Sequence, residues 1–310
     1  MSRNNPASAE AFWPIAAVER DTGLSKDTLR VWERRYGFPA PARDAIGERA
    51  YPLAQVERLR IVKRLLDGGQ RPSRVVAMPL VELQRLAAAL TERGCASDLP
   101  VPPDLQSYLA LLHGHEIEAL RRRLSQAQVR MGLGPFVRDV LVPLNTLIGE
   151  AWMRGQIEIF QEHAYSELQQ NLLRQALATL PAPDAAQPRV LLTTLPGEWH
   201  SHGLLLAEAM FAIEGAQCLS LGAQTPLWNV PLAAHAYRSD IVALGFSGCM
   251  NANQVVDGLT ELRREIPASV GIWVGGSSPV LLRRPVGRVK VIVNLDAIRA
   301  ALQAWQSGER

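Results

Sequence analysis

Five short apolar runs in the C-terminal third place the strongest constraint on the fold of this chain. RVLLTTL begins at residue 189, and QCLSLG, DIVALGF, GIWVGG and VKVIV follow, separated by helix-like or turn segments. Strands that are apolar along their whole length are buried on both faces, so this alternation indicates a parallel sheet wrapped by helices. Ligands of such sheets bind beyond the carboxyl ends of the strands. The loops expected to bind a ligand therefore follow Leu195, Leu221, Phe246 and Val274.

Helical periodicity dominates the middle of the chain. Four segments carry apolar residues at helical spacing and are separated by short glycine-containing breaks: LQSYLALLHG, EIEALRRRLSQAQVR, LGPFVRDVLVPLNTLIGEAWMRG and IEIFQEHAYSELQQNLLRQALATL. They predict a four-helix bundle over residues 105–182. Proline- and alanine-rich stretches lie on both sides of this bundle. The first is a linker over residues 83–104, and the second is PAPDAAQP, which precedes a predicted Rossmann-like α/β domain at 188–308.

The N-terminal segment IAAVERDTGLSKDTLRVWERRYG has the spacing of a helix-turn-helix. A short helix ends at a tight turn, and Ser25 caps a second helix with Asp27 in its first turn. Leu29 and Trp32 lie three residues apart and are predicted to face a core. The residues left to face outward are Thr28, Arg30, Arg34 and Arg35. Such a row can enter a major groove, and the alternative for this helix alone is an ordinary solvated arginine face.

Composition narrows the class of protein. A chain of 310 residues that is 47% hydrophobic can bury two or three separate cores, and the net charge of +3 makes any basic surface local. The three cysteines, Cys95, Cys218 and Cys249, are far apart and predict reduced thiols. No apolar run is long enough to span a membrane and no leader peptide is evident, so we expect a cytoplasmic protein. The first strand is not followed by a G-x-G-x-x-G dinucleotide fingerprint.

An ordered set of motifs runs through the helix-turn-helix and past it, over about 65 residues that begin near Trp13. It comprises TLRVWERRYG at 28–37, the turn with Pro39 and Pro41, R-x-x-x-G-x-R-x-Y at 43–51, and a third helix ending at Gly68-Gly69. This set resembles the MerR family of winged helix-turn-helix regulators. The resemblance implies a DNA-binding domain over residues 10–82 and a double-stranded operator as partner. The resemblance also implies that four residues lie near the DNA, Thr28, Arg30, Arg34 and Tyr36. It implies that three lie on the wing, Arg43, Arg49 and Tyr51.

The first strand-end loop, GEWHSHG, contains Glu198-x-His200-x-x-Gly203. This pattern resembles the D/E-x-H-x-x-G signature of cobalamin-binding domains, which implies that His200 binds cobalt from below. Glu198 would fix the tautomer of the imidazole, and Gly203 would let the nucleotide tail pass. The positions that would line the slot of the tail are Gly222, Thr225, Ser247, Gly275 and Gly276. Cys249 stands where that family has leucine. We expect His202 to be a surface residue or to support the cobalt ligand without binding cobalt itself.

A third motif lies in the bundle, where Trp152 precedes Glu162-His163 in a W-x9-E-H pattern. The pattern resembles the CarH/LitR cobalamin-dependent photoreceptors, and it implies Trp152 over the adenosyl group and Glu162 on the ribose hydroxyls. A buried tryptophan and a solvated Glu-His pair are the alternative. The upper-face histidine of that family is here Met153, a poor ligand for oxidised cobalt. Either His163 substitutes, or the receptor relaxes differently, or light sensing is lost, or Met153 only packs beside the corrin.

Together these motifs predict a cytoplasmic transcriptional regulator, a repressor and not an enzyme, controlled by adenosylcobalamin or another cobalamin and by light. We expect a homo-oligomer, dimer or tetramer, that presents several DNA-binding heads. A cobalamin enzyme would need a catalytic partner domain, and the N-terminal head occupies that place in the chain. The main alternative is a MerR-like regulator that has lost cobalamin binding or photochemistry. Such a regulator would take its signal from a protein partner or another small molecule.

Overall fold

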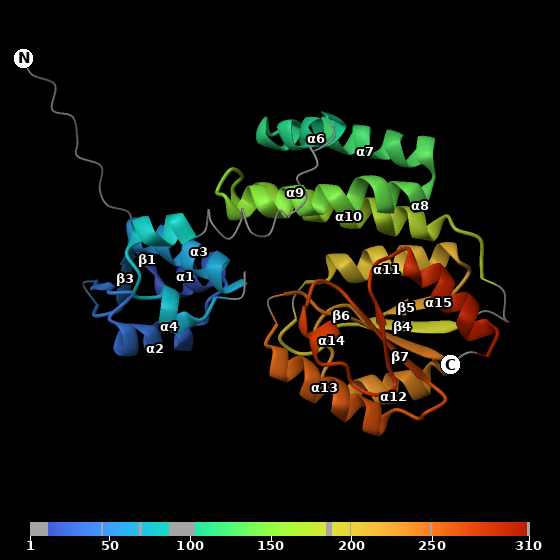
Figure 1. Cartoon of the computed structure of the whole chain (residues 1–310). Coiled ribbons are helices and arrows are strands. Elements are labelled where there is room, and N and C mark those ends of the chain that lie inside the picture. The colour runs from blue at the N-terminus through green and yellow to red at the C-terminus, as the bar shows by residue number, and fades with distance from the viewer. Residues whose placement is uncertain are drawn as a thin grey trace, which may run out of the picture. The chain divides into compact units, whose positions relative to one another are not determined.

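The computed structural model describes residues 12–44, 46–67, 70–86, 103–183, 188–198, 200–248 and 250–308. The chain forms two compact units, residues 1–98 and residues 99–310 (Figure 1). Most of the predicted linker, residues 87–102, lies outside the described residues, as do Gly68, Gly69 and Cys249. Within the described ranges, no helix is both long enough and apolar enough to cross a membrane.

The N-terminal unit is a winged helix-turn-helix. Its elements are β1 (Phe12–Pro14), α1 (Ile15–Thr22), α2 (Lys26–Tyr36), β2 (Ala42–Arg43), β3 (Arg49–Pro52), α3 (Leu53–Asp67) and α4 (Pro72–Val75). Gly23 takes a left-handed φ of 68°, which ends α1, and the Ser25 side chain accepts from the backbone N–H of Thr28 to begin α2. Leu29 and Trp32 are buried, as predicted. The sheet order is β1-β3-β2, and the sequence did not predict β1.

The bundle follows in the second unit. Its elements are α6 (Pro103–His113), α7 (Ile117–Met131), α8 (Leu133–Pro135), the π-helical segment η1 (Phe136–Leu141), α9 (Val142–Met153) and α10 (Ile159–Ala178). The consecutive α8, η1 and α9 make the third of the four predicted helices. Its π-helical segment ends where the Val142 N–H donates to the Val137 carbonyl, and the next residue, Pro143, has no N–H to continue the ladder.

The C-terminal part is a parallel sheet in which each of the five predicted apolar runs forms one strand. The strands are β4 (Arg189–Thr193), β5 (Gln217–Ser220), β6 (Ile241–Gly245), β7 (Gly271–Gly275) and β8 (Val289–Ile292), in the order β5-β4-β6-β7-β8. All four pairings are parallel. The chain order reverses between β4 and β6. Ligands of open parallel sheets bind outside the carboxyl ends of the strands at such a point, and we refer to this region as the β4–β6 crevice.

Helices cover both faces of this sheet (Figure 1). On one face lie α11 (His202–Ile213) and α15 (Ala297–Gln306), and on the other α12 (Asn229–Ala236), α13 (Ala252–Glu265) and α14 (Val280–Arg283). The first face shares one hydrophobic core with the bundle, because Leu173 of α10, Phe211 of α11 and Trp273 of β7 belong to the same buried cluster. Arg174 of α10 also donates to both carboxylate oxygens of Glu208 on α11, at 2.8 Å each. The bundle is therefore fixed above α11.

Candidate functional site

The loop after β4 carries a buried carboxylate that joins two strand ends. Glu198 is 1% exposed. Its Oε2 accepts hydrogen bonds from the backbone N–H and the hydroxyl of Ser247, which follows β6, at 2.7 and 2.8 Å. Its Oε1 accepts from the backbone N–H of His200 at 3.0 Å and pairs with His200 Nδ1 at 2.7 Å. Glu198 thus spans the β4–β6 crevice and holds His200 at its edge.

This contact assigns a proton to one ring nitrogen of the histidine. Burial raises the pKa of Glu198, but hydrogen bonds from His200 and Ser247 outweigh it, so the pKa lies below its ordinary value and the group is ionised at neutral pH. A carboxylate can only accept, so Nδ1 of His200 carries a proton, and in the neutral imidazole the lone pair is then on Nε2. The side chain of His200 is 54% exposed. An oriented imidazole of this kind suits a metal ligand.

Threonines at the end of β4 hold the neighbouring loop in place. Thr193 Oγ1 donates to the Gly222 carbonyl at 2.9 Å and lies 2.7 Å from Thr225 Oγ1. Thr194 Oγ1 donates to the Glu198 carbonyl at 2.7 Å. The loop after β5 and the loop after β4 therefore form one hydrogen-bonded wall. Neither threonine was predicted as a site residue, although RVLLTTL carries a polar pair at the end of an apolar run.

At this edge of the sheet, the backbone requires glycine at one position and leaves open space at another. Gly276 has a φ of 117°, and a Cβ there would lie 2.1 Å from the Phe246 carbonyl oxygen, so the backbone approach itself demands glycine. A Cβ at Gly203 would meet no heavy atom of the described chain within 4 Å. Packing of the protein does not require glycine at Gly203, and the open space leaves room for a ligand. Gly275 lies beside Ile292 on the next strand.

The bundle brings its motif to the same region. Trp152 is half-buried against the shared core. Glu162 lies in the first turn of α10, 3.1 Å from Nδ1 of the exposed His163, and accepts from the Ser166 hydroxyl at 2.6 Å. Burial lowers the pKa of His202 at the start of α11, and Glu162 partly opposes that shift. The carboxylate of Glu162 is thus within electrostatic range of the strand-end loop.

Two positions where the sequence departs from the cobalamin pattern are not described in full. Met153 closes α9, but its side chain lies outside the described part of the structure, and so does the whole of Cys249. The predictions made for their side chains stay predictions.

A second group of predicted residues lies on α2 and the wing hairpin. On α2, Arg30, Arg34 and Arg35 are exposed, while Thr28 and Tyr36 are half-buried. Arg30 is bonded to Asp27 at 3.2 Å. The guanidinium of Arg35 lies 5.4 Å from the centre of the Tyr36 ring. The helix therefore presents a basic face with two arginines held by neighbours.

The wing residues differ from one another. Arg43 is exposed, whereas Arg49 is half-buried and donates from Nε to Glu33 of α2 at 2.7 Å. Tyr51, predicted on the wing, is fully buried in the core of the N-terminal unit, and its buried hydroxyl has no hydrogen-bond partner among the described residues. Burial raises the pKa of Tyr51. Because β3 alternates its side chains between two faces, Tyr51 points inward, and we leave it out of the proposed DNA contacts.

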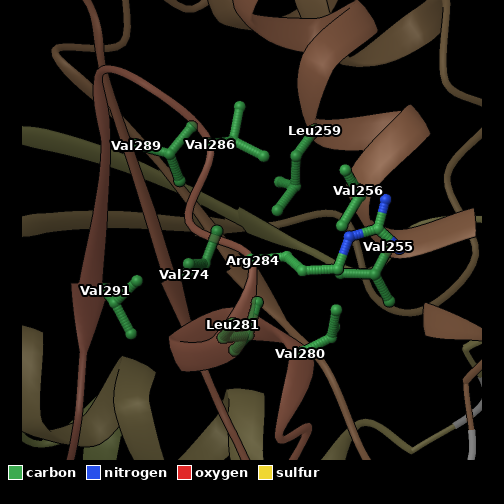
Figure 2. A pocket seen from close by; sticks show the side chains of 10 residues that line it. All are labelled: Val255, Val256, Leu259, Val274, Val280, Leu281, Arg284, Val286, Val289 and Val291. Carbon is green, nitrogen blue, oxygen red and sulfur yellow. The ribbon is translucent and has the colours of Figure 1, made fainter. Parts of the chain in front are cut away.

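A small pocket elsewhere in the sheet domain does not supply site chemistry (Figure 2). It lies between α13, α14 and the strands β7 and β8. Its lining is Val255, Val256, Leu259, Val274, Val280, Leu281, Arg284, Val286, Val289 and Val291. Apart from the one guanidinium this lining is valine and leucine, so we assign the pocket to packing of the short α14 on the sheet.

Comparison with known proteins agrees with this architecture. Residues 14–78 match the family model described as MerR HTH family regulatory protein. The sheet and bundle resemble the monomethylamine corrinoid protein of Methanosarcina barkeri, with a TM-score of 0.52 and 17% identity over 64% of this chain and 96% of that one. A MerR-type DNA-binding unit joined to a helical bundle and a Rossmann-like sheet therefore defines the class.

The particular family follows from two repressors of Myxococcus xanthus. CarH is 29% identical over 274 residues, which cover 87% of this chain and 90% of CarH. CarA is 34% identical over 237 residues, which cover 75% of each protein. The chain belongs to the family of MerR-type transcriptional repressors that contains CarH and CarA. The regulator MlrA of Escherichia coli is 37% identical over 65 residues, which cover 21% of this chain.

Proposed function

We propose that this chain is a cobalamin-dependent repressor that holds its cofactor between the bundle and the carboxyl ends of the strands. The observation that carries the proposal is the Glu198 carboxylate, which joins His200 to Ser247 across the β4–β6 crevice. In open parallel sheets the ligand binds at this point of the topology. The hydrogen bond to Nδ1 presents Nε2 of His200 as the ligand for cobalt.

The residues present suit such a cofactor. The side chain of His200 is more than half exposed, Gly203 borders open space, and the charge of Glu162 on α10 acts on His202, which follows the loop at the start of α11. In the proposed complex, Trp152 packs over the adenosyl group and Glu162 accepts from its ribose hydroxyls. The slot of the nucleotide tail is lined by Gly222, Thr225, Ser247, Gly275 and Gly276. Adenosylcobalamin supplies the light-sensitive bond.

Regulation follows from multivalency. Cofactor binding at the interface of the bundle and the sheet would organise a homo-oligomer, dimer or tetramer, that presents several DNA-binding heads. Linked heads gain affinity through effective concentration, so a change of oligomer releases DNA without altering any single protein–DNA contact. The heads bind double-stranded operator DNA through Thr28, Arg30, Arg34, Arg35, Tyr36, Arg43 and Arg49.

Reconstitution tests the proposal. The purified chain is mixed in the dark with adenosylcobalamin and passed through gel filtration, and we expect cobalamin to elute with the protein. His200→Ala should lose the imidazole-bound spectrum and most of the retained cofactor. His235→Ala, an exposed histidine at the end of α12, is the matched control and should behave as wild type. If wild type retains no cobalamin, the cofactor proposal is wrong and the regulator takes another signal.

A further inference from the structure

An acidic side chain lies within the basic face proposed to bind DNA. Glu33 is on α2 in the string RVWERRYG, next to Arg34. Its Oε2 accepts a hydrogen bond from Nε of Arg49 at 2.7 Å, and the two side chains are 28% and 25% exposed. The pKa of Arg49 is raised above its ordinary value, with the hydrogen bond to Glu33 as the largest cause. The pair links the predicted recognition helix to the first residue of wing strand β3.

The wing needs such a link at this position. Strand β1 pairs with β3 only from Ala50 to Pro52, so Arg49 lies one residue beyond that support. On its other side, Arg49 is directly opposite Arg43 of the two-residue strand β2. Like charges directly opposite each other destabilise a strand pair, and a carboxylate beside them offsets this repulsion. Glu33 therefore supports the hairpin at the position where β1 no longer pairs with β3 and where two arginines face each other.

We propose that Glu33 is a positioning residue for DNA recognition, which holds the wing at a fixed place relative to α2 so that both engage one duplex together. By accepting from Nε, Glu33 leaves the two terminal amino groups of Arg49 as the donors that can reach a phosphate. The inference rests on the proposed DNA-binding role of α2 and the wing.

The sign of the effect separates positioning from simple electrostatics. If Glu33 were only a negative charge near DNA, its neutralisation would strengthen binding to any duplex, because repulsion of the phosphates falls. If Glu33 positions the wing, its neutralisation weakens binding to a cognate duplex and leaves binding to an unrelated duplex equal or stronger. Phosphate attraction alone suffices for an unrelated duplex, whereas sequence readout needs a fixed geometry.

The experiment uses the full chain and two duplexes of equal length, one enriched by the wild-type protein from a random pool and one of unselected sequence. Glu33→Gln should weaken binding of the enriched duplex about tenfold, the scale of one good contact, and should not weaken binding of the other. Asp27→Asn is the matched control, since Asp27 is on the same helix, is 89% exposed and pairs with Arg30 within α2 rather than with the wing. It should weaken neither duplex.

Arg49→Gln supplies the test of mechanism. Because Glu33 acts through Arg49, Glu33→Gln should cause no further loss in the Arg49→Gln background. Thermal melting of each variant checks that the N-terminal unit is folded, and Glu33→Asp replaces Glu33→Gln if it is not. Tighter binding of both duplexes by the Glu33 variant, or an equal loss in both backgrounds, would overturn the inference. If wild type enriches no duplex, the proposed DNA-binding role is itself wrong, and the role of Glu33 with it.

Discussion

Glu198→Gln is the substitution whose effect the structure specifies most closely. The carboxylate is buried and accepts from four donors, two on Ser247 and two on His200. Glutamine keeps the shape but replaces one acceptor oxygen with an NH₂ donor. In either orientation of the amide, its NH₂ group faces the donors of Ser247 or those of His200. The hydrogen bonds that remain go to a neutral oxygen instead of a charged one. Leaving a buried donor unsatisfied costs about 1–3 kcal/mol, and two donors are affected, so we expect a loss of roughly 2–6 kcal/mol.

The loss should depend on pH with a definite sign. The pKa of Glu198 is lower in the folded protein than its ordinary value of 4.5. A group with a depressed pKa stabilises the fold fully above its unfolded pKa, and that contribution disappears as pH falls through the folded pKa. The difference in unfolding free energy between wild type and Glu198→Gln should therefore be full at pH 7 and shrink below pH 4.5.

Urea unfolding of the second unit, followed by tryptophan fluorescence, measures this difference. Glu261→Gln removes an exposed carboxylate from α13 and should change stability by no more than about 0.5 kcal/mol. Reconstitution supplies the second readout, because loss of a group that orients a metal ligand lowers affinity about 10- to 100-fold. Unchanged stability at pH 7 together with unchanged cobalamin retention would show that the Glu198 network neither holds the crevice nor orients His200.

Two further predictions concern the other motifs. Arg34→Ala should weaken operator binding by about 1–3 kcal/mol and leave cobalamin uptake unchanged, because Arg34 is exposed on α2; a gel-shift titration at moderate salt that matches wild type would remove it from the interface. Illuminated wild type should show the absorption spectrum of a cobalamin with one imidazole ligand, because no histidine follows Trp152, whereas Met153→His should gain a two-imidazole spectrum and retain its cofactor. Two imidazole ligands in illuminated wild type would contradict this and indicate His163.

The parts of the fold that the sequence predicted are those that depend on local pattern. The five apolar runs became the five strands, and the spacing of Leu29 and Trp32 correctly predicted the buried face of α2. The wing shows where local pattern was not enough. The family resemblance placed Tyr51 on the wing, and β3 carries it, but its side chain is buried in the core of the N-terminal unit, and its partner across the sheet is Trp13 of β1. The sequence did not predict β1, so this consequence was not visible.

In the candidate site, a contact between residues close in the sequence could be predicted, and a contact between distant residues could not. Glu198 and His200 are two residues apart, so a strand-end motif is enough to predict that they interact. Glu198 and Ser247 are 49 residues apart, and both follow strands in the sequence. Whether two strand ends form one crevice depends on which strands are neighbours, and β4 lies beside both β5 and β6 only because the sheet reverses its order there. Periodicity predicts strands but not their order.

The contact between Glu33 and Arg49 could not be predicted from the sequence either. The two residues are 16 apart, and their contact requires the wing hairpin to fold back on α2. Chemistry that joins distant elements therefore needed the three-dimensional structure, while chemistry within one loop could be predicted from sequence.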